Sequence, residues 1–375
     1  MKKLLLILLC LPMIGFGQTQ TYVPDNVFEQ NLINLGLDSL LDSFVTTATI
    51  DTVTTLNIMP VPTGSTLPPW TAYASNLIGI EDFILLDSLI VDATLDSVDL
   101  SDNLVLRSLT LSSVPSLDLT NNIDLEYVEI GLSNPPTFVT GPFNVNGLTN
   151  LKRLEIGGLT GPLDLSTNTS LTDLVCGPTG SFGGSSITSL NVNGAVSLEN
   201  LNCSGNQLTN LDVSNNTALT SLHCENNNLL TLNLSSSIEY LNCDYNKLTS
   251  LDLSMCSQYY GTLRCQDNEL TSLDLRTGTN MGMYPIATGN FLQCVDVDSV
   301  SWSYINWPLV GPVSCFDPTV SFSTNCSGVT SIQEHTTNKE LLKVTDLLGR
   351  DTKQINQLLL YLYEDGTVEK KIAVE

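Results

Sequence analysis

Four tandem copies of one pattern of apolar residues, cysteine and asparagine occupy the segment from Leu198 to Leu275. The repeated residues are Leu198, Leu201, Cys203, Asn206, Leu208, Leu211 and Val213; Leu219, Leu222, Cys224, Asn227, Leu229, Leu232 and Leu234; Ile238, Leu241, Cys243, Asn246, Leu248, Leu251 and Leu253; and Tyr260, Leu263, Cys265, Asn268, Leu270, Leu273 and Leu275. A copy of about 20 residues cannot bury its own apolar side chains, so copies must stack on one another. The spacing therefore predicts a solenoid.

The spacing inside each copy predicts a short strand followed by a turn. Leu201 and Cys203 are two residues apart, so both face the interior, whereas Asn202 between them faces outward. Asn206 then lies where the chain turns. The N–H and C=O groups of a buried turn need partners, and an asparagine amide can donate and accept.

These copies resemble leucine-rich repeats, in particular the short variety LxxLxCxxNxLxxLDLxxN known as the IRREKO repeat. The resemblance implies a mostly β solenoid with a parallel sheet on its concave side. It also implies an asparagine ladder that bonds to backbone groups of adjacent coils, made here by Asn206, Asn227, Asn246 and Asn268.

Less regular copies extend the repeat on both sides. They are Val53, Leu56, Ile58; Leu86, Leu89, Val91; Leu106, Leu109, Leu111; Leu125, Val128, Ile130; Leu151, Leu154, Ile156; Leu171, Leu174, Cys176; and a partial copy, Leu292 and Cys294. We expect about ten or eleven coils over residues 50–295. The early copies have no asparagine in the ladder position, which holds Thr94, Val114, Ser133, Leu159 and Thr179. Their turns should be less regular, with insertions at 60–76, 135–146 and 177–186.

Both ends of the chain differ from the repeats. Residues 1–17 have two lysines, an apolar run and small residues, as in a secretory signal peptide. No later stretch is apolar enough to span a membrane. We expect an N-terminal cap over residues 18–49, with an amphipathic helix between Tyr22 and Leu37 whose buried side would hold Val27, Leu32 and Leu35. Residues 296–328 are rich in aromatic residues and should cap the other end.

Residues 329–375 form a separate unit with three expected strands, Leu341–Thr345, Leu358–Tyr363 and Val368–Val374. Turns are expected at Gly349 and around Asp365 and Gly366. Through LLKVTDLLGR, YEDGTVEKK and the apolar ending, this unit resembles the type A sorting domain of the type IX secretion system. The resemblance implies a small β-sandwich-like domain and export by a Gram-negative bacterium, with the product left on the outer surface or released.

Position separates the ten cysteines into groups. Cys10 lies in the signal peptide, which leaves an odd number. We expect a ladder of buried free thiols in the L-x-C position, since free cysteine packs as a small hydrophobic residue. Its members are Cys176, Cys203, Cys224, Cys243, Cys265 and Cys294. The leucine-rich repeat resemblance implies a disulfide between Cys294 and Cys326 that closes the solenoid, while the pairing of Cys256 and Cys315 stays open.

The charge balance narrows the classes of partner. With 39 acidic against 14 basic residues, the formal net charge is −25 at pH 7. Phosphates of nucleic acids would be repelled, so nucleic acid is excluded as a partner. The acidity either keeps an exported protein soluble or favours cations and basic surfaces.

The sequence contains no catalytic motif, so we expect no enzyme, no cofactor and no metal site. His223, near Asn202, Asn242, Tyr240, Glu225 and Asp244, is either a binding or proton-relay group or a solvated histidine. Aspartates in the L-D-L position would line up between stacked coils; they either bind calcium or point outward into solvent or hydrogen-bond to the next coil. These are Asp99, Asp118, Asp164, Asp212, Asp252 and Asp274, with Asn191 and Asn233 in the same position.

The outward residues of the concave strands do not repeat, which is typical of a recognition surface. We expect a surface or secreted protein that binds a protein or glycan, as in adhesion. The candidate ligand-binding residues are Tyr127, Glu129, Arg153, Glu155, Asn202, His223, Tyr240, Asn242 and Arg264. The alternatives are a structural surface-layer protein and, more remotely, a hydrolase with its site in the insertion at 60–76 or 135–146.

Overall fold

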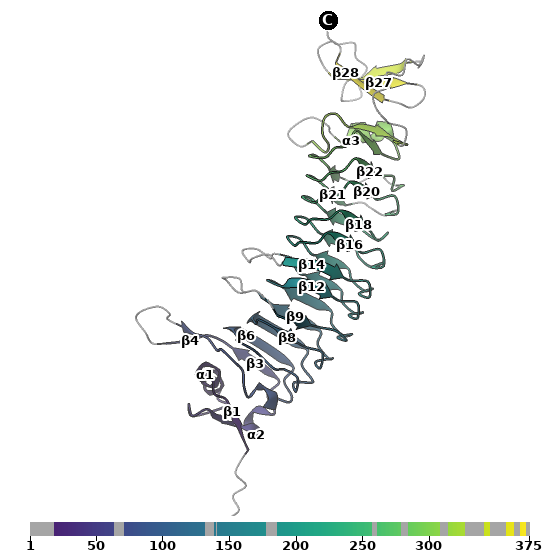
Figure 1. Cartoon of the computed structure of the whole chain (residues 1–375). Coiled ribbons are helices and arrows are strands. Elements are labelled where there is room, and N and C mark those ends of the chain that lie inside the picture. Colours follow the sequence, from purple (N-terminus) through teal and green to yellow (C-terminus); the bar gives the residue numbers. More distant parts are fainter. Residues whose placement is uncertain are drawn as a thin grey trace, which may run out of the picture.

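The computed structural model describes residues 19–63, 71–131, 139, 141–177, 186–256, 261–278, 284–307, 314–326, 341–345, 358–363 and 368–372. Its main element is an 11-stranded parallel sheet whose strand order follows the sequence (Figure 1). The strands are β3 (Thr55–Ile58), β6 (Ser88–Thr94), β7 (Ser108–Ser113), β9 (Tyr127–Ile130), β11 (Arg153–Ile156), β13 (Asp173–Val175), β15 (Asn200–Asn202), β17 (Ser221–His223), β19 (Tyr240–Asn242), β21 (Thr262–Arg264) and β23 (Tyr284–Ile286). The predicted parallel solenoid is therefore confirmed.

Shorter strands form a second side of the solenoid. They pair as β8–β10, β12–β14, β16–β18 and β20–β22–β24–β25. Their bounds are Leu117–Asp118 (β8), Phe143–Asn144 (β10), Thr160–Asp164 (β12), Ser186–Asn191 (β14), Asn210–Asp212 (β16), Thr231–Asn233 (β18), Ser250–Asp252 (β20), Ser272–Asp274 (β22), Cys294–Asp296 (β24) and Ser321–Ser323 (β25). Leu201 of the first sheet and Leu211 of the second are both buried, because the apolar core lies between the two sides.

The asparagines that follow the cysteines hold successive coils together. Asn227 donates from Nδ2 to the carbonyl oxygens of Cys203 and Cys224, and its Oδ1 accepts from the N–H of Leu208. The residue before each such asparagine has a positive φ, which turns the chain sharply. These residues are Gly205, Asn226, Tyr245, Asp267 and Gly289. Asn290 accepts from the N–H of Leu270 and donates to the carbonyl oxygen of Cys265, so it continues the ladder. The sequence did not predict this member.

A second set of buried asparagines serves the other turn. Asn122 donates from Nδ2 to the carbonyl oxygens of Leu100 and Asn103, one coil earlier. The members of this set are Asn103, Asn122, Asn168 and Asn216, each fully buried. Cys256 occupies the equivalent position in a later coil, and its thiol contacts the carbonyl oxygen of Ser235. The early coils therefore have asparagine support of their own, at a turn that the sequence analysis did not consider.

Five free thiols form the ladder, all buried and unpaired: Cys176, Cys203, Cys224, Cys243 and Cys265. The prediction that Cys294 continues this ladder is wrong. Ala287, after β23, takes the next position, where its N–H bonds to the carbonyl oxygen of Cys315. Cys294 instead begins β24 on the second side, with Asp296 opposite Asp274. The concave strand β23 carries Pro285 and Ala287 in place of leucine and cysteine, and the next L-x-C, Leu292 to Cys294, lies on the second side. Cys294 was therefore assigned to the wrong half of its copy.

The N-terminal end is closed by a helix and two short strands. Helix α1 (Asn26–Asn34) begins at Asp25, whose Oδ1 accepts from the N–H groups of Val27 and Phe28. Asn31 exchanges two hydrogen bonds with the backbone of Met59, just after β3, so α1 covers the edge of the first coil. The prediction that Leu35 is buried is wrong: it is 52% exposed.

Phe28 takes the buried place on α1 instead and packs on Phe83. The other elements at this end are β1 (Gln20–Tyr22), β2 (Phe44–Thr46), α2 (Thr47–Ile50), β4 (Val61–Pro62), β5 (Thr71–Ala72) and the 3₁₀ turn η1 (Ile80–Asp82). The expected signal peptide, together with Cys10, lies outside the described residues, as do Ser133, Thr179, Tyr260, Gly349, Asp365 and Gly366.

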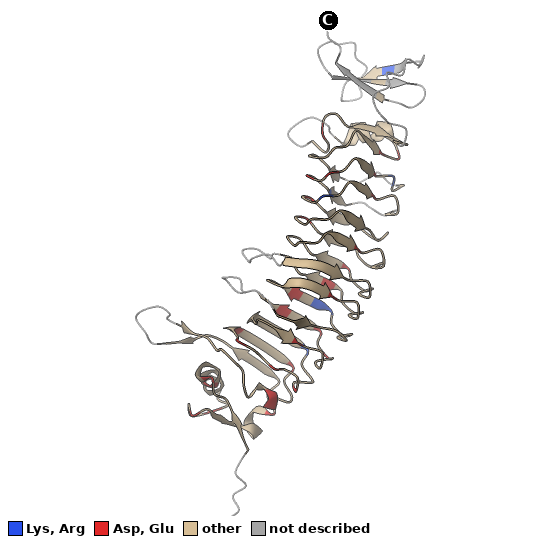
Figure 2. Cartoon of the chain, viewed as in Figure 1, with Lys and Arg blue, Asp and Glu red and all other residues tan. Residues whose placement is uncertain are grey.

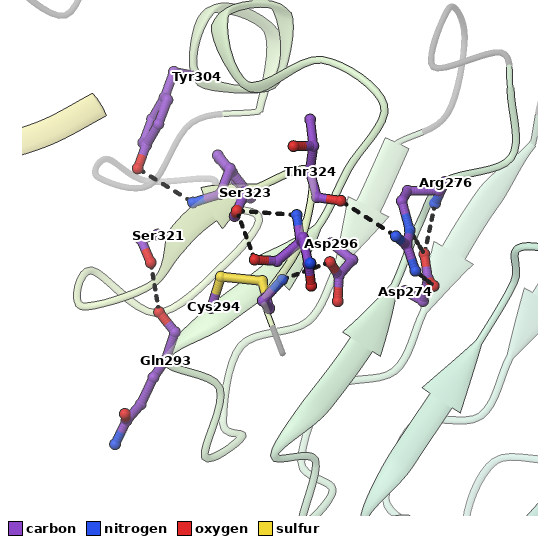
Figure 3. The surroundings of a disulfide bond; sticks show 12 residues. Asp274, Arg276, Gln293, Cys294, Asp296, Tyr304, Ser321, Ser323 and Thr324 are labelled. Atoms are coloured by element: carbon purple, nitrogen blue, oxygen red, sulfur yellow. Dashed lines mark hydrogen bonds and ion pairs between the residues drawn. A yellow bond between two sulfur atoms is a disulfide. The ribbon is translucent and has the colours of Figure 1, made fainter. Parts of the chain in front are cut away.

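The C-terminal end of the solenoid contains a disulfide and an aromatic cluster. Cys294 and Cys326 are bonded, as the resemblance implied, and join β24 to the residues after β25 (Figure 3). Trp307, buried at the end of helix α3 (Val300–Asn306), packs against Phe316 and Phe322. The Tyr304 hydroxyl accepts from the N–H of Phe322. Helix and disulfide together cover the last coil.

Three antiparallel strands follow, β26 (Leu341–Thr345), β27 (Leu358–Tyr363) and β28 (Val368–Ile372). They start where the sequence placed them, and the expected end of the last strand, Ala373 and Val374, lies outside the described residues. They form one sheet; the described residues contain no second layer to make a β-sandwich. Within the described part of the chain, no helix has the length and apolar character needed to cross a membrane.

Candidate binding face

The candidate face is the outward side of the 11-stranded sheet. The parallel register aligns its outward residues in columns along the stack. In one column, Tyr127 lies beside Arg153, and Arg153 lies beside Asp173. In the other, the aligned order is Glu129, Glu155, Val175, Asn202, His223, Asn242 and Arg264. Tyr240 belongs to the first column, beside Ser221. The candidate residues of the sequence thus lie on one face, because the same two outward positions recur in every coil.

The N-terminal half of this face is charged. Arg153 donates from its guanidinium to a carboxylate oxygen of Glu155 at 2.9 Å. Glu129 lies beside Glu155 on the neighbouring strand, and burial together with the Glu155 charge raises the pKa of Glu129. Tyr127, in the other column, exposes 47% of its surface. This half therefore offers an aromatic ring next to a mixed group of charges.

The middle of the face is polar and aromatic. The His223 ring packs on Tyr240 with centroids 4.8 Å apart, between the flanking Asn202 and Asn242. His223 Nδ1 lies 3.8 Å from Oε2 of Glu225. The Asn202 side-chain oxygen accepts from both the N–H and the hydroxyl of Ser204, so the amide is held in one orientation. Fixed amides and stacked rings can form directed contacts with a ligand.

Arg264 is the last charged residue of this column among the described strands, and it forms an ion pair with Asp244. Nε of Arg264 donates to Oδ2 of Asp244 at 2.9 Å, while Oδ1 of Asp244 accepts from the N–H of Gln266. Asp244 is buried, and Arg264 remains partly exposed. Asp244 is therefore the ion-pair partner of Arg264 and not of His223.

The aspartates of the L-D-L position cap their own turns. Asp212 Oδ1 accepts from the N–H and hydroxyl of Ser214, and these bonds lower the pKa of Asp212. Asn191 makes the same backbone bond to Asn193. The equivalent backbone bond is made by Asp99, Asp118, Asp164, Asp252 and Asp274. No group of three or more histidine, cysteine, aspartate or glutamate side chains is placed to hold a metal ion within the ranges that the structure describes.

The protein is strongly acidic as a whole, and Figure 2 shows acidic positions distributed along the stack with few basic ones between them. One cavity of about 460 Å³ lies beside the disulfide, lined by residues that include Phe291, Asp296 and Cys326. It contains none of the candidate residues of the concave face. That face is an open sheet, suited to binding a large surface rather than to enclosing a small molecule.

No protein-family model and no curated protein matches the sequence. Among solved structures, the functional domain of InlJ from Listeria monocytogenes, which includes a cysteine ladder, is 22% identical, with a TM-score of 0.46 over 82% of this chain and 71% of that chain. Internalin C2 from Listeria monocytogenes is 19% identical, with a TM-score of 0.40 over 55% of this chain and 86% of that chain. The leucine-rich repeat protein LIC12759 from Leptospira interrogans is 18% identical, with a TM-score of 0.31 over 58% of this chain and 70% of that chain. With its stacked parallel strands and asparagine-supported turns, this chain is a mostly β, parallel-sheet solenoid.

Proposed function

We propose that this protein is exported and binds an extracellular protein or glycan through the concave face of its solenoid. One observation carries the proposal: inward positions repeat from coil to coil, whereas outward positions do not. Leu201, Leu222 and Leu241 align in the interior. The outward residues of the adjoining column differ in type, as Val175, His223 and Arg264 show. A repeated core with a varied surface favours recognition over a purely structural role.

The pair of His223 and Tyr240 is the place to test this proposal. The chain beginning at residue 18 would be labelled and applied to arrays of extracellular proteins and glycans, with the double variant H223A/Y240A beside it. We expect at least one ligand, bound about tenfold or more weakly by the variant, because ring contacts dominate binding at such surfaces. The matched control is N210A, which changes an exposed residue of β16 on the second side.

Two outcomes would contradict the proposal. One is an array with no signal above background for the parent chain. The other is equal binding by the parent and H223A/Y240A. Self-association of the parent chain in light scattering, without any ligand, would favour the structural surface-layer role instead.

For export, we propose delivery by the type IX secretion system through residues 329–375. The support is the tail sequence LLKVTDLLGR and YEDGTVEKK, on and between the strands β26, β27 and β28. The test is expression in a Gram-negative host that has this system, with the full gene and with one lacking residues 329–375. We expect the full product at the outer surface or in the medium, and the shortened one in the periplasm. Equal surface delivery of both would overturn the route while leaving ligand binding untouched.

A further inference from the structure

Three successive coils expose an aliphatic side chain at the same position, on the turn that leads into the concave strands. Ile84, Leu104 and Ile123 are 54%, 55% and 57% exposed. Backbone bonds fix the alignment, since the N–H of Arg107 bonds to Asp87 and that of Glu126 bonds to Arg107. Stacked coils lie about 4.8 Å apart, so these side chains form one continuous row.

Leu85 and Val105 extend the row and are 48% and 37% exposed. We call these five residues, Ile84, Leu85, Leu104, Val105 and Ile123, the aliphatic row. Its members lie directly beside buried supports: Phe83, Asn103 and Asn122 each precede a row residue. The row is therefore held on a rigid base.

The fold itself does not require aliphatic residues in this row. The same backbone register continues into later coils, where the equivalent exposed residues are Thr149, Thr169 and Thr217. Val196 is the exception and is 50% exposed, with threonine in the coils on both sides. Threonine thus satisfies the turn, and the run of Ile84, Leu104 and Ile123 leaves apolar area uncovered. Contiguous exposed apolar area marks interaction surfaces.

Carboxylates adjoin this row. A cavity of about 400 Å³ is lined by Asn76, Leu77, Ile78, Glu81, Ser97, Val98, Asp99 and Asp102. Glu81 and Asp102 lie three and two residues before Ile84 and Leu104, so the cavity adjoins the row along the chain. Asp124 directly follows Ile123.

Within the described ranges, no lysine or arginine is paired with these carboxylates. None of the ion pairs among the described residues involves Glu81, Asp99, Asp102 or Asp124. Arg107, just before β7, is already paired with Asp87, and Lys152, just before β11, is paired with Glu126. The charge beside the row is therefore negative and available to an outside cation.

We propose that the aliphatic row and the acidic cavity form a second docking surface, for a basic polypeptide segment in which lysine or arginine lies next to aliphatic side chains. The aliphatic residues of the partner would cover the row, and its cations would meet Glu81, Asp99 and Asp102. Charge complementarity decides the occupant. A second copy of this chain, with its net charge of −25, would be repelled, and so would an anionic membrane.

The test uses the full chain and a fluorescent amphipathic peptide made only of leucine and lysine, followed by anisotropy. A peptide of leucine and glutamate is the charge control. We expect the lysine peptide to bind and the glutamate peptide not to bind, with affinity falling as salt is raised. The triple variant I84T/L104T/I123T, which installs the residue found in later coils, should weaken binding at least about tenfold. V196T, the matched control, should bind like the parent chain.

Further measurements separate the alternatives. D102N/D124N should weaken binding and reduce its salt dependence, whereas H223A/Y240A on the concave face should change nothing. The proposal is overturned if the glutamate peptide binds equally, or if the triple variant binds like V196T. It is also overturned if the parent chain forms a dimer that the triple variant loses, or if zwitterionic vesicles bind through the row.

Discussion

The side-chain nitrogen of Asn227 donates to the carbonyl oxygen of Cys203, one coil earlier, at 3.0 Å. The oxygen of the same amide accepts from the N–H of Leu208, also in the earlier coil, at 3.0 Å. One side chain thus satisfies a donor and an acceptor that the turn would otherwise leave buried without partners. Asn246 makes the equivalent bonds to Cys224 and Leu229, so each coil is fastened to the one before it.

Replacing Asn227 with alanine should lower the free energy of unfolding by roughly 2–4 kcal/mol, because several buried backbone groups lose their partners. Urea denaturation followed by circular dichroism would measure the loss. Asn215 is exposed, so N215A is the control and should change stability by less than about 0.5 kcal/mol. Equal losses in N227A and N215A would show that the ladder does not stabilise the stack.

The buried thiols predict a loss of stability at alkaline pH. Burial raises the pKa of the Cys176 thiol from 9.0 to about 12, and that of Cys203 is also raised. Between pH 9 and 12 the folded chain therefore holds protons that the unfolded chain has released, so the free energy of unfolding must fall as pH rises. Denaturation curves from pH 8 to 11 should show this decline, with a shallower slope in C176A. An identical slope in both proteins would contradict it.

Substitutions of Cys224 separate packing from polarity in the thiol ladder. C224A removes one buried sulfur and should cost about 1–2 kcal/mol of stability. C224S introduces a hydroxyl among apolar neighbours and should cost more, about 2–3 kcal/mol. Thermal unfolding of both variants gives the order. If serine were tolerated better than alanine, the ladder would not be the dry interior that its burial indicates.

Reduction of the disulfide should loosen the C-terminal end of the solenoid. Cys294 and Cys326 close a loop with a sequence separation of 32, a constraint worth about 2–4 kcal/mol. Hydrogen exchange with and without dithiothreitol should show faster exchange in β25 and α3, with β15 and β17 unchanged. In C294A/C326A, dithiothreitol should have no further effect. Faster exchange throughout the chain would mean that the disulfide supports more than this end.

The aspartate of the L-D-L position should be replaceable by asparagine but not by alanine. The hydroxyl and N–H of Ser214 lower the pKa of Asp212, so its contribution to stability is lost as pH falls through that lowered value. D212A should cost about 1 kcal/mol at neutral pH. D212N should leave the free energy of unfolding almost unchanged, since Asn191 makes the same bond to its own turn. The stability of D212N should also depend less on acidification. Thermal unfolding at pH 3 and 7 provides the comparison; equal losses in D212A and D212N would argue against the turn role.

Calcium offers a separate test of the same column. If the aspartates act only as turn caps, adding calcium should leave the melting temperature unchanged in calorimetry. A clear rise would instead show a structural calcium site.

The sequence by itself determined the stacked architecture, because the rule that places Leu201 and Cys203 inward and Asn202 outward depends only on residues two apart. The same rule located the candidate face residues in columns. It also located the strands near Leu341 and Leu358, since short-range alternation is enough to specify a strand. The repeated asparagines were found from spacing alone, from Asn206 to Asn268.

Only the tertiary structure decided the last coil, because β23 carries Pro285 and Ala287 where earlier coils have leucine and cysteine. The unpaired backbone edge of β21 selects β23 as its neighbour whatever its side chains, through bonds such as that from Cys265 N–H to Ile286. Cys294 therefore lies on the second side of the solenoid, in β24. Similarly, Ile84, Leu104 and Ile123 become one row only when coils stack. Periodicity specifies what each coil buries, but contacts between distant residues decide its neighbours and the surfaces they share.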